Sequence, residues 1–359
     1  MKLPSSEQLD TNYISSVFNS TTTTYKFFWF ITLLDNFVKE GKNRVEIWDL
    51  VIGIISNAWY PITYYRLSFG KSDSLHRAIW QLQDQYKIPI NIQKTDLEYE
   101  LKKLCNLPEV RKTLVFLTTY VPYRFLSPWI NTPNNQELKS RTYYYENNCL
   151  YRILTKDHKL YIELNPEWHD YLIKNYSVLL DFSYWNLLLF LQIRNPNVPN
   201  ISSKLIKIEN RSPLKKQREY WDTIIDKYPS IKCIYTNNIL SINNYDIDHF
   251  IPWSFVSHNL LWNLIPADSN INSSKSNKLP KLTQFLPGLV SLHQLAISEH
   301  LKASSYCKVL EDYYALGSTP QELADMDYDT IYDCFYKILS PIYQIAENMG
   351  FEQWRKFIL

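Results

Sequence analysis

Large apolar side chains recur at helical spacing through the first hundred residues. A Ser/Thr-rich stretch near residue 22 offers helix caps, and the segment up to residue 40 then carries apolar residues on most of its helical surface. Further helices are expected at about 45–59, ending before Pro61, and at 73–86, after Gly70. The first region is therefore predicted to be mainly helical, with the 22–40 helix deep inside it.

The pattern changes between residues 111 and 164. Short runs at 143–145, 150–154 and 160–164 are rich in Tyr, Ile and Leu and predict strands, and the polar triplet 156–158 between the last two predicts a turn. We expect a small hairpin packed on helices, followed by helices over 166–192.

A Pro/Asn-rich stretch interrupts the chain at residues 195–200. Its sequence, Asn-Pro-Asn-Val-Pro-Asn, cannot continue a helix. We expect a boundary here, which gives a helical targeting or partner-binding region at 1–200. A region with a basic lead-in would follow at 201–285, and a C-terminal helical segment at 286–359 would pack on the rest.

Composition supports a folded chain without indicating its partner. Of the 359 residues, 45% are hydrophobic, 15% aromatic and 21% charged, so a sizeable core can form. The net charge of +2 does not by itself imply nucleic acid. Local basic clusters are usually solvated faces, but the candidates for phosphate contact are Lys204, Lys207, Arg211, Lys215 and Lys278.

The cysteines and the apolar runs indicate in which cellular compartment the chain is expected. Five scattered cysteines without a C-x-x-C pair argue against a disulfide framework and a cysteine zinc knuckle, and fit a reducing cytoplasm. The first twelve residues lack the apolar core of a signal peptide, and the runs at 27–34 and 50–55 are too short to span a bilayer. No membrane association is expected.

One stretch carries concentrated chemistry: Asp248-His249, then Asn263, then Asn272 and Lys275. Imidazole titrates near neutral pH, so His249 is a suitable general base for activating water. The oxygens of Asp248 and Asn272 are the hard ligands that Mg²⁺ prefers, and two protein ligands suffice because this ion keeps waters and takes substrate oxygens.

The spacing predicts how these groups meet. Residues 245–250 and 264–266 are expected to be short strands joined by a loop, and 268–277 a polar helix capped by Asp268 or Ser269. Asn272 would then face the strand end that bears Asp248 and His249. A lone Asp-His pair is usually a surface feature, so the argument depends on the order and spacing of the whole set.

The stretch from about 231 to 281 resembles the HNH, or ββα-metal, endonuclease superfamily, and is similar to the HNH domain of RNA-guided CRISPR nucleases. The resemblance implies that Asp248 and Asn272 bind Mg²⁺ or Mn²⁺, that His249 is the general base and that Asn263 braces the loop. It also implies that Lys275 lies near the scissile phosphate or stabilises negative charge.

Many relatives hold a structural zinc with C-x-x-C pairs beside this motif. Here Cys233 is retained, but Thr236 stands where the second cysteine would be. Structural zinc is therefore not expected. The fold class expected overall is α+β: a mainly helical protein with an embedded ββα-metal finger and a small β-hairpin region in the middle.

The leading hypothesis is a metal-dependent HNH endonuclease that hydrolyses DNA. HNH nucleases of this size are commonly bacterial, and the richness in Asn, Ile, Lys and Tyr suits an AT-rich bacterial genome. A role in restriction or anti-phage defence, with a defence-system partner protein, is favoured because a two-hundred-residue extension is more than a bare toxin needs. Double-strand cleavage usually needs two copies, so a homodimer is considered. Two alternatives stay open: a non-catalytic nucleic-acid-binding or scaffold protein on a degenerate finger, and an RNA-cleaving toxin.

Overall fold

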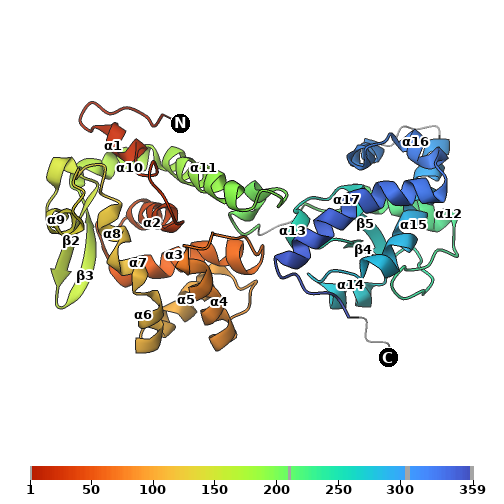
Figure 1. The fold of residues 1–359 in the computed structure, drawn as a ribbon, viewed down its shortest axis with the longest axis horizontal. Helices are drawn as coiled ribbons and strands as arrows, with labels where there is room; N and C mark the ends of the chain where they lie inside the picture. The colour runs from red at the N-terminus through yellow and green to blue at the C-terminus, as the bar shows by residue number, and fades with distance from the viewer. Residues whose placement is uncertain (1, 209–211, 304–307, 356–359) are drawn as a thin grey trace. The chain divides into compact units, whose positions relative to one another are not determined.

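The computed structural model describes residues 2–208, 212–303 and 308–355. The chain divides into two compact units: residues 1–196 with 201–207, and residues 197–200 with 208–359. Within the described residues, helices dominate both units, with one three-stranded and one two-stranded sheet (Figure 1). The predicted α+β, mainly helical fold class is confirmed.

The core of the first unit surrounds helix α2, Tyr25–Leu34, which continues as a π-helical turn over Asp35–Lys39. Every residue from Phe27 to Leu34 is buried, as the apolar pattern predicted. Helices α3, Ile47–Thr63, and α11, Tyr176–Arg194, pack against α2. Gly53 allows α2 and α3 to approach closely, because a Cβ at this position would collide with Thr32.

Helix α3 departs from the prediction at both ends. Residues Arg44–Glu46 form strand β1 instead of a first helical turn, and the helix passes through Pro61 to end at Thr63. A proline so close to a helix end removes only one hydrogen bond, and Trp59, Pro61 and Ile62 are all buried here. Packing therefore outweighs the local preference to stop.

The predicted hairpin is present. Strands β2, Tyr151–Lys156, and β3, Lys159–Leu164, pair antiparallel, and β1 adds to β3 to give the order β1-β3-β2. Asp157 and His158 form the two-residue turn with positive φ, which suits a tight hairpin. The strand expected at 143–145 was wrong: this segment is a turn before a 3₁₀ helix, Glu146–Asn148, where Asn147 and Asn148 adopt positive φ.

The remaining helices of the first unit cover this core. Helix α4, Ser74–Tyr86, begins where the Asp73 side chain accepts a hydrogen bond from the Leu75 amide, and matches the prediction for 73–86. The others are mostly short: α1 Thr11–Ser15, α5 Lys94–Leu104, α6 Pro108–Leu114, α7 Phe116–Thr119, α8 Val121–Arg124, α9 Asn135–Arg141 and α10 His169–Lys174. 3₁₀ turns follow at Pro166–Trp168 and Ile201–Lys204.

The second unit wraps helices around a two-stranded sheet (Figure 1). Helix α15 packs against α12, α16 and α17, and Trp221, His293 and Phe335 are fully buried in this helical layer. The elements are α12 Lys215–Lys227, β4 Asp246–His249, α13 Trp253–Val256, β5 Leu264–Ala267, α14 Ser269–Lys275, α15 Leu282–Lys302, α16 Pro320–Asp325 and α17 Tyr328–Asn348, with 3₁₀ turns at Leu261–Asn263 and Lys308–Leu316.

Two features bear on the predicted organisation. The expected boundary at residue 200 falls where the chain passes between the units, and residues 286–359 belong to the second unit together with 208–285. Among the described residues, no helix has the length and apolarity to cross a membrane.

Candidate active site

The predicted strand–loop–strand–helix arrangement is present around Asp248 and His249. Strands β4 and β5 pair antiparallel, with Asp248 opposite Ile265 and His249 opposite Leu264. Helix α14 follows β5 and packs against β4. The Asp268 carboxylate caps this helix by accepting a hydrogen bond from the Asn270 amide at 3.0 Å.

Asp248 is buried beneath the site, with 3% of its surface exposed. One carboxylate oxygen lies 3.0 Å from Lys275 Nζ, and the other accepts a hydrogen bond from the Tyr235 hydroxyl at 2.7 Å. The pKa of Asp248 is raised on balance, because burial outweighs the Lys275 charge and the Tyr235 hydrogen bond, which act to lower it. These two partners oppose burial and favour the carboxylate form that a metal ligand requires.

Lys275 is fully buried and joins α14 to β4. Its ammonium also donates to the His249 backbone oxygen at 2.7 Å. The Lys275 ammonium therefore forms hydrogen bonds with both the Asp248 carboxylate and the His249 backbone carbonyl. The expected contact with a scissile phosphate stays a prediction.

His249 is half-buried at the end of β4. Its Nε2 lies 3.0 Å from Oδ1 of Asn259, in the loop between the strands. An amide oxygen only accepts hydrogen bonds, so Nε2 is the donor in this contact. A neutral imidazole that donates from Nε2 has its basic lone pair on Nδ1.

Asn263 closes the loop that follows His249. Its buried side chain donates to the Ile251 carbonyl at 2.9 Å and accepts from the Ile251 amide at 2.8 Å, and its own carbonyl accepts from the Phe250 amide at 2.8 Å. Three hydrogen bonds thus tie the chain just past His249 to the start of β5.

Asn272 is half-buried on α14, one turn before Lys275. In the described part of the chain, no protein group forms a hydrogen bond with its side chain, and no cluster of three or more His, Cys, Asp or Glu residues could hold a metal ion. A carboxylate from β4 and an amide oxygen from α14 nevertheless fit Mg²⁺, which needs few protein ligands and hard oxygen donors.

Two residues that support the site were missed at the sequence level. Tyr235 and Asn259 contact Asp248 and His249, but each stands in a short polar or aromatic run that gives no sign of its partner. Tyr235 lies in the turn that begins at Cys233, where backbone hydrogen bonds of 2.8 and 2.9 Å join Cys233 to Asn238 and Asn237. The Cys233 sulfur accepts from the Asp268 amide at 3.4 Å. Hydrogen bonds therefore hold this turn to the start of α14.

The predicted phosphate-binding residues have different surroundings. Lys215 and Lys278 are exposed in the second unit. Lys207 belongs to the first unit, where it donates to the Asn91 carbonyl at 3.1 Å and lies over the Tyr60 ring. Lys204 is fully buried in that unit, which removes it from any phosphate-binding surface. Arg211 lies outside the described residues.

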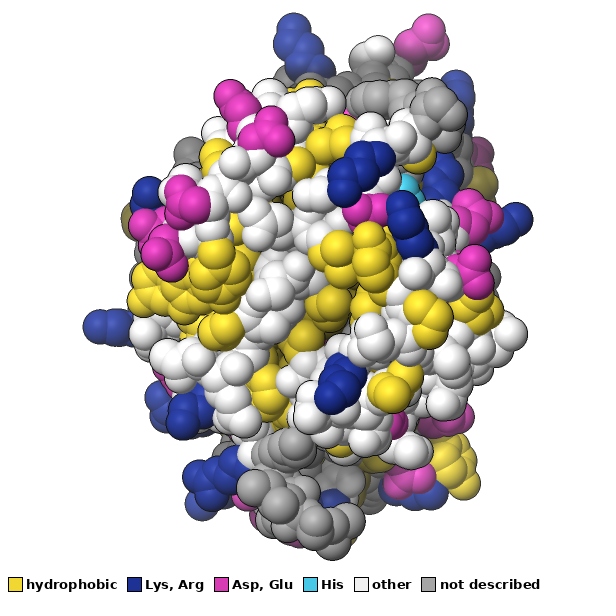
Figure 2. All heavy atoms as spheres, turned by 90° about the vertical axis from the view of Figure 1, so that its right-hand side faces the viewer, with side chains coloured by type: hydrophobic (Ala, Val, Ile, Leu, Met, Phe, Trp, Pro, Cys, Tyr) yellow, Lys and Arg dark blue, Asp and Glu magenta, His cyan; other side chains and the backbone are white. Residues whose placement is uncertain are grey.

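Figure 2 shows one face of the molecule. Lys and Arg side chains are interspersed with Asp and Glu there, and small hydrophobic patches lie between them. This face carries no extended basic area.

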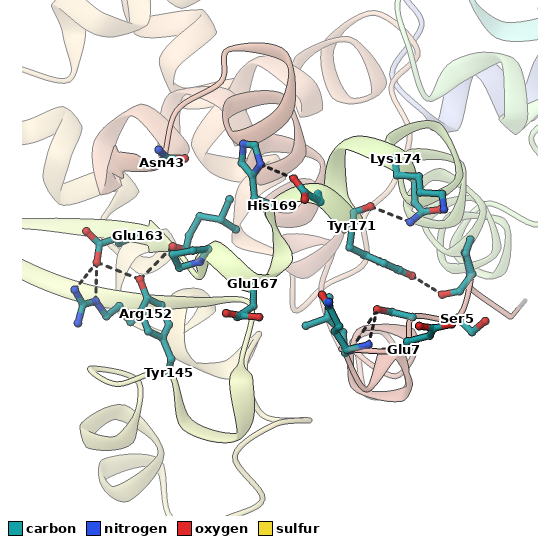
Figure 3. Close-up of a pocket in the computed structure, with 18 residues that line it drawn as sticks. Ser5, Glu7, Asn43, Tyr145, Arg152, Glu163, Glu167, His169, Tyr171 and Lys174 are labelled. Carbon is teal, nitrogen blue, oxygen red and sulfur yellow. Dashed lines mark hydrogen bonds and ion pairs between the residues drawn. The ribbon is translucent and has the colours of Figure 1, made fainter.

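A cavity of the first unit has a volume of about 1180 Å³. Its charged groups largely satisfy one another: Glu163 accepts from Arg152 and from the Tyr145 hydroxyl, and His169 contacts Asp170 (Figure 3). It contains none of the residues of the Asp248–His249 site.

Comparison with known proteins gives one family. A family model described as HNH endonuclease matches residues 230–281, which cover the Cys233 turn, both strands and α14. No solved structure matches the chain.

Proposed function

Because residues 230–281 belong to the HNH endonuclease superfamily, we propose that this chain is a metal-dependent endonuclease that hydrolyses phosphodiester bonds in DNA. The observation that supports the proposal is the ββα unit itself: Asp248 and His249 end strand β4, His249 is bonded to Asn259, and helix α14, which bears Asn272, packs against β4.

The proposed reaction is an in-line displacement by water. Nδ1 of His249 takes a proton as the water oxygen bonds to phosphorus, and the bond from phosphorus to the leaving oxygen breaks. Asn259 keeps the imidazole in the required tautomer, and Asn263 fixes the loop that positions both. A divalent ion held by Asp248 and Asn272 would neutralise charge on the phosphate and the leaving oxygen.

The test is plasmid cleavage with Mg²⁺ or Mn²⁺, compared with EDTA. The native chain should convert supercoiled plasmid to nicked or linear DNA only with metal, and His249→Ala should lower the rate by about 10²- to 10⁴-fold. His169→Ala, an exposed histidine of the first unit, is the matched control and should cut normally. Unchanged cutting by His249→Ala would falsify the role of this residue.

A parallel assay with RNA separates the toxin alternative. If RNA is degraded and DNA is left intact, the substrate of the enzyme is RNA and not DNA. Asp248→Ala and Asn272→Ala should weaken metal dependence, seen as a higher Mg²⁺ concentration at half-maximal rate.

One observation favours the non-catalytic alternative. Both oxygens of Asp248 already have protein partners, Tyr235 and Lys275. A carboxylate has further lone pairs, so metal binding is compatible with these bonds. A mobility shift of DNA without cleavage, under every metal tested, would support a binder over an enzyme.

We place this activity in bacterial restriction or anti-phage defence. The support is the large helical first unit, which is more than a bare cutting domain needs. Host cells that carry the native gene should show fewer phage plaques than cells that carry His249→Ala. Equal plaque numbers for both would remove the defence role while leaving the nuclease proposal to the plasmid assay.

A further inference from the structure

A second cavity of the first unit has an unusual charge composition. It has a volume of about 440 Å³ and lies between the segment that leads into α2 and the segment around α8 and α9. Its lining includes two charged side chains, Lys26 and Arg124, and no Asp or Glu. Hydroxyl groups surround them, from the Ser-Thr-Thr-Thr run at 20–23, Tyr25, Ser127 and Thr132.

The two cations have neutral partners. Lys26 Nζ donates to the Val17 carbonyl at 3.1 Å, and Arg124 donates to the Asn135 side-chain oxygen at 3.3 Å and lies over the Tyr120 ring. Among the described residues, no ion pair within 4.0 Å joins either of them to a carboxylate. Other cations of this unit do pair with carboxylates, as Arg44 and Arg152 do with Glu163.

The acidic groups nearby serve other partners. Glu137, on α9, pairs with Arg141 at 2.9 Å and accepts from Thr132. Asp73 accepts from the amide and hydroxyl of Thr24, both at 2.7 Å. Neither lines the cavity.

The lysine is affected by burial and by the neighbouring guanidinium. Burial, and then the charge of Arg124, lower the pKa of Lys26 to about 8. A bound anion would offset both the burial of the ammonium and the repulsion from Arg124.

We propose that this cavity binds a phosphate-bearing small molecule, with the phosphate between Lys26 and Arg124. Paired cations and hydroxyl donors match the oxygens of a phosphate. The volume exceeds that of a phosphate alone and lies in the range of about 300–1,000 Å³ found for small-ligand pockets. The Tyr120 ring, 52% exposed, offers a stacking surface for an aromatic part of the ligand. The site goes beyond the nuclease function and does not depend on it.

The test is calorimetric titration of the full chain in EDTA, which keeps divalent metal out of the measurement. The probes are inorganic phosphate and AMP at constant ionic strength. Lys26→Met keeps the aliphatic stem and removes the charge, and Arg124→Gln changes an exposed side chain, so folding should survive. Each variant should weaken binding roughly tenfold or more. Tyr120→Ala should weaken AMP more than phosphate.

Lys112→Met, at an exposed lysine of α6 in the same unit, is the matched control and should bind like the native chain. The proposal is overturned if the native chain binds neither probe at about 1 mM, or if Lys112→Met loses as much affinity as Lys26→Met. Binding of a DNA oligonucleotide alone, lost in the Lys26 and Arg124 variants, would also overturn it and assign the cations to nucleic acid.

Discussion

Burial gives the lysines of this chain different chemistry. Lys275 and Lys204 are both fully buried. The ammonium of Lys275 lies 3.0 Å from the Asp248 carboxylate. At Lys204, burial lowers the pKa of the side chain to about 7. Lys215 and Lys278 are exposed. The sequence around each lysine does not show which of them is buried or paired with a carboxylate, because the residues that surround a lysine in the fold come from distant segments.

We expect Asn259 to act as a positioning residue for His249, because its side-chain oxygen lies 3.0 Å from Nε2. Asn259→Ala should lower the cleavage rate roughly tenfold to a hundredfold, since the imidazole loses the partner that fixes its tautomer. Asn259→Asp should shift the acidic limb of the pH–rate profile to higher pH, because a carboxylate favours imidazolium. Rates measured across pH check both, and a profile unmoved in Asn259→Asp would contradict the contact.

Lys204 should make stability depend on pH. Its pKa is about 7 in the folded chain against an ordinary value of 10.5, so between these values the unfolded chain binds more protons and the unfolding free energy rises with pH. The rise is bounded by roughly 1.4 kcal/mol per pH unit. Below pH 7 the folded chain carries the full cost of the buried charge.

Lys204→Met should remove this rise and stabilise the chain most below pH 7. Urea unfolding at several pH values measures it, with the exposed Lys112→Met as the control. If Lys204→Met shows the native slope, the lysine is not the group that titrates.

At the scale of elements, one buried ion pair links α14 to β4. Helix α14 has only seven residues, which is too short to be stable by itself. The Asp268 cap and the bonds from Lys275 to Asp248 and to the His249 carbonyl hold it on the sheet. The position of Asn272 therefore depends on this pair.

Lys275→Met should destabilise the chain by about 3–5 kcal/mol, because it leaves Asp248 as an unpaired buried carboxylate. The double variant Asp248→Asn/Lys275→Met should recover part of the loss. Tyr235→Phe, which keeps the charge pair, should cost only about 1 kcal/mol. Urea unfolding measures all three, and equal losses for Lys275→Met and Tyr235→Phe would mean that the pair contributes little.

For the whole molecule, charge is balanced and binding to nucleic acid has to be local. The net charge is +2, and both signs are mixed on the face in Figure 2. Under the proposed function, we expect the DNA-binding surface to include exposed lysines of the second unit, such as Lys278 after α14 and Lys215 at the start of α12.

Lys215→Ala and Lys278→Ala should each reduce DNA affinity similarly for all sequences, and reduce the slope of log affinity against log salt by about 0.9. Fluorescence anisotropy at several salt concentrations measures the slope. Lys337→Ala, an exposed lysine of α17, should leave it unchanged. An equal change of slope in all three variants would show that only the net charge of the protein matters for DNA binding, and not the position of the lysine.

The sequence by itself determined the α+β class, the buried α2 helix, the β2–β3 hairpin and the ββα order, since apolar periodicity and turn residues act over short distances. It also placed Asp248, His249 and Asn272 in one motif. Only the tertiary structure decided that α3 continues through Pro61, that Lys204 is buried, and that Tyr235 and Asn259 contact the acid and the histidine. These outcomes depend on packing and on partners distant in sequence, which local patterns do not encode.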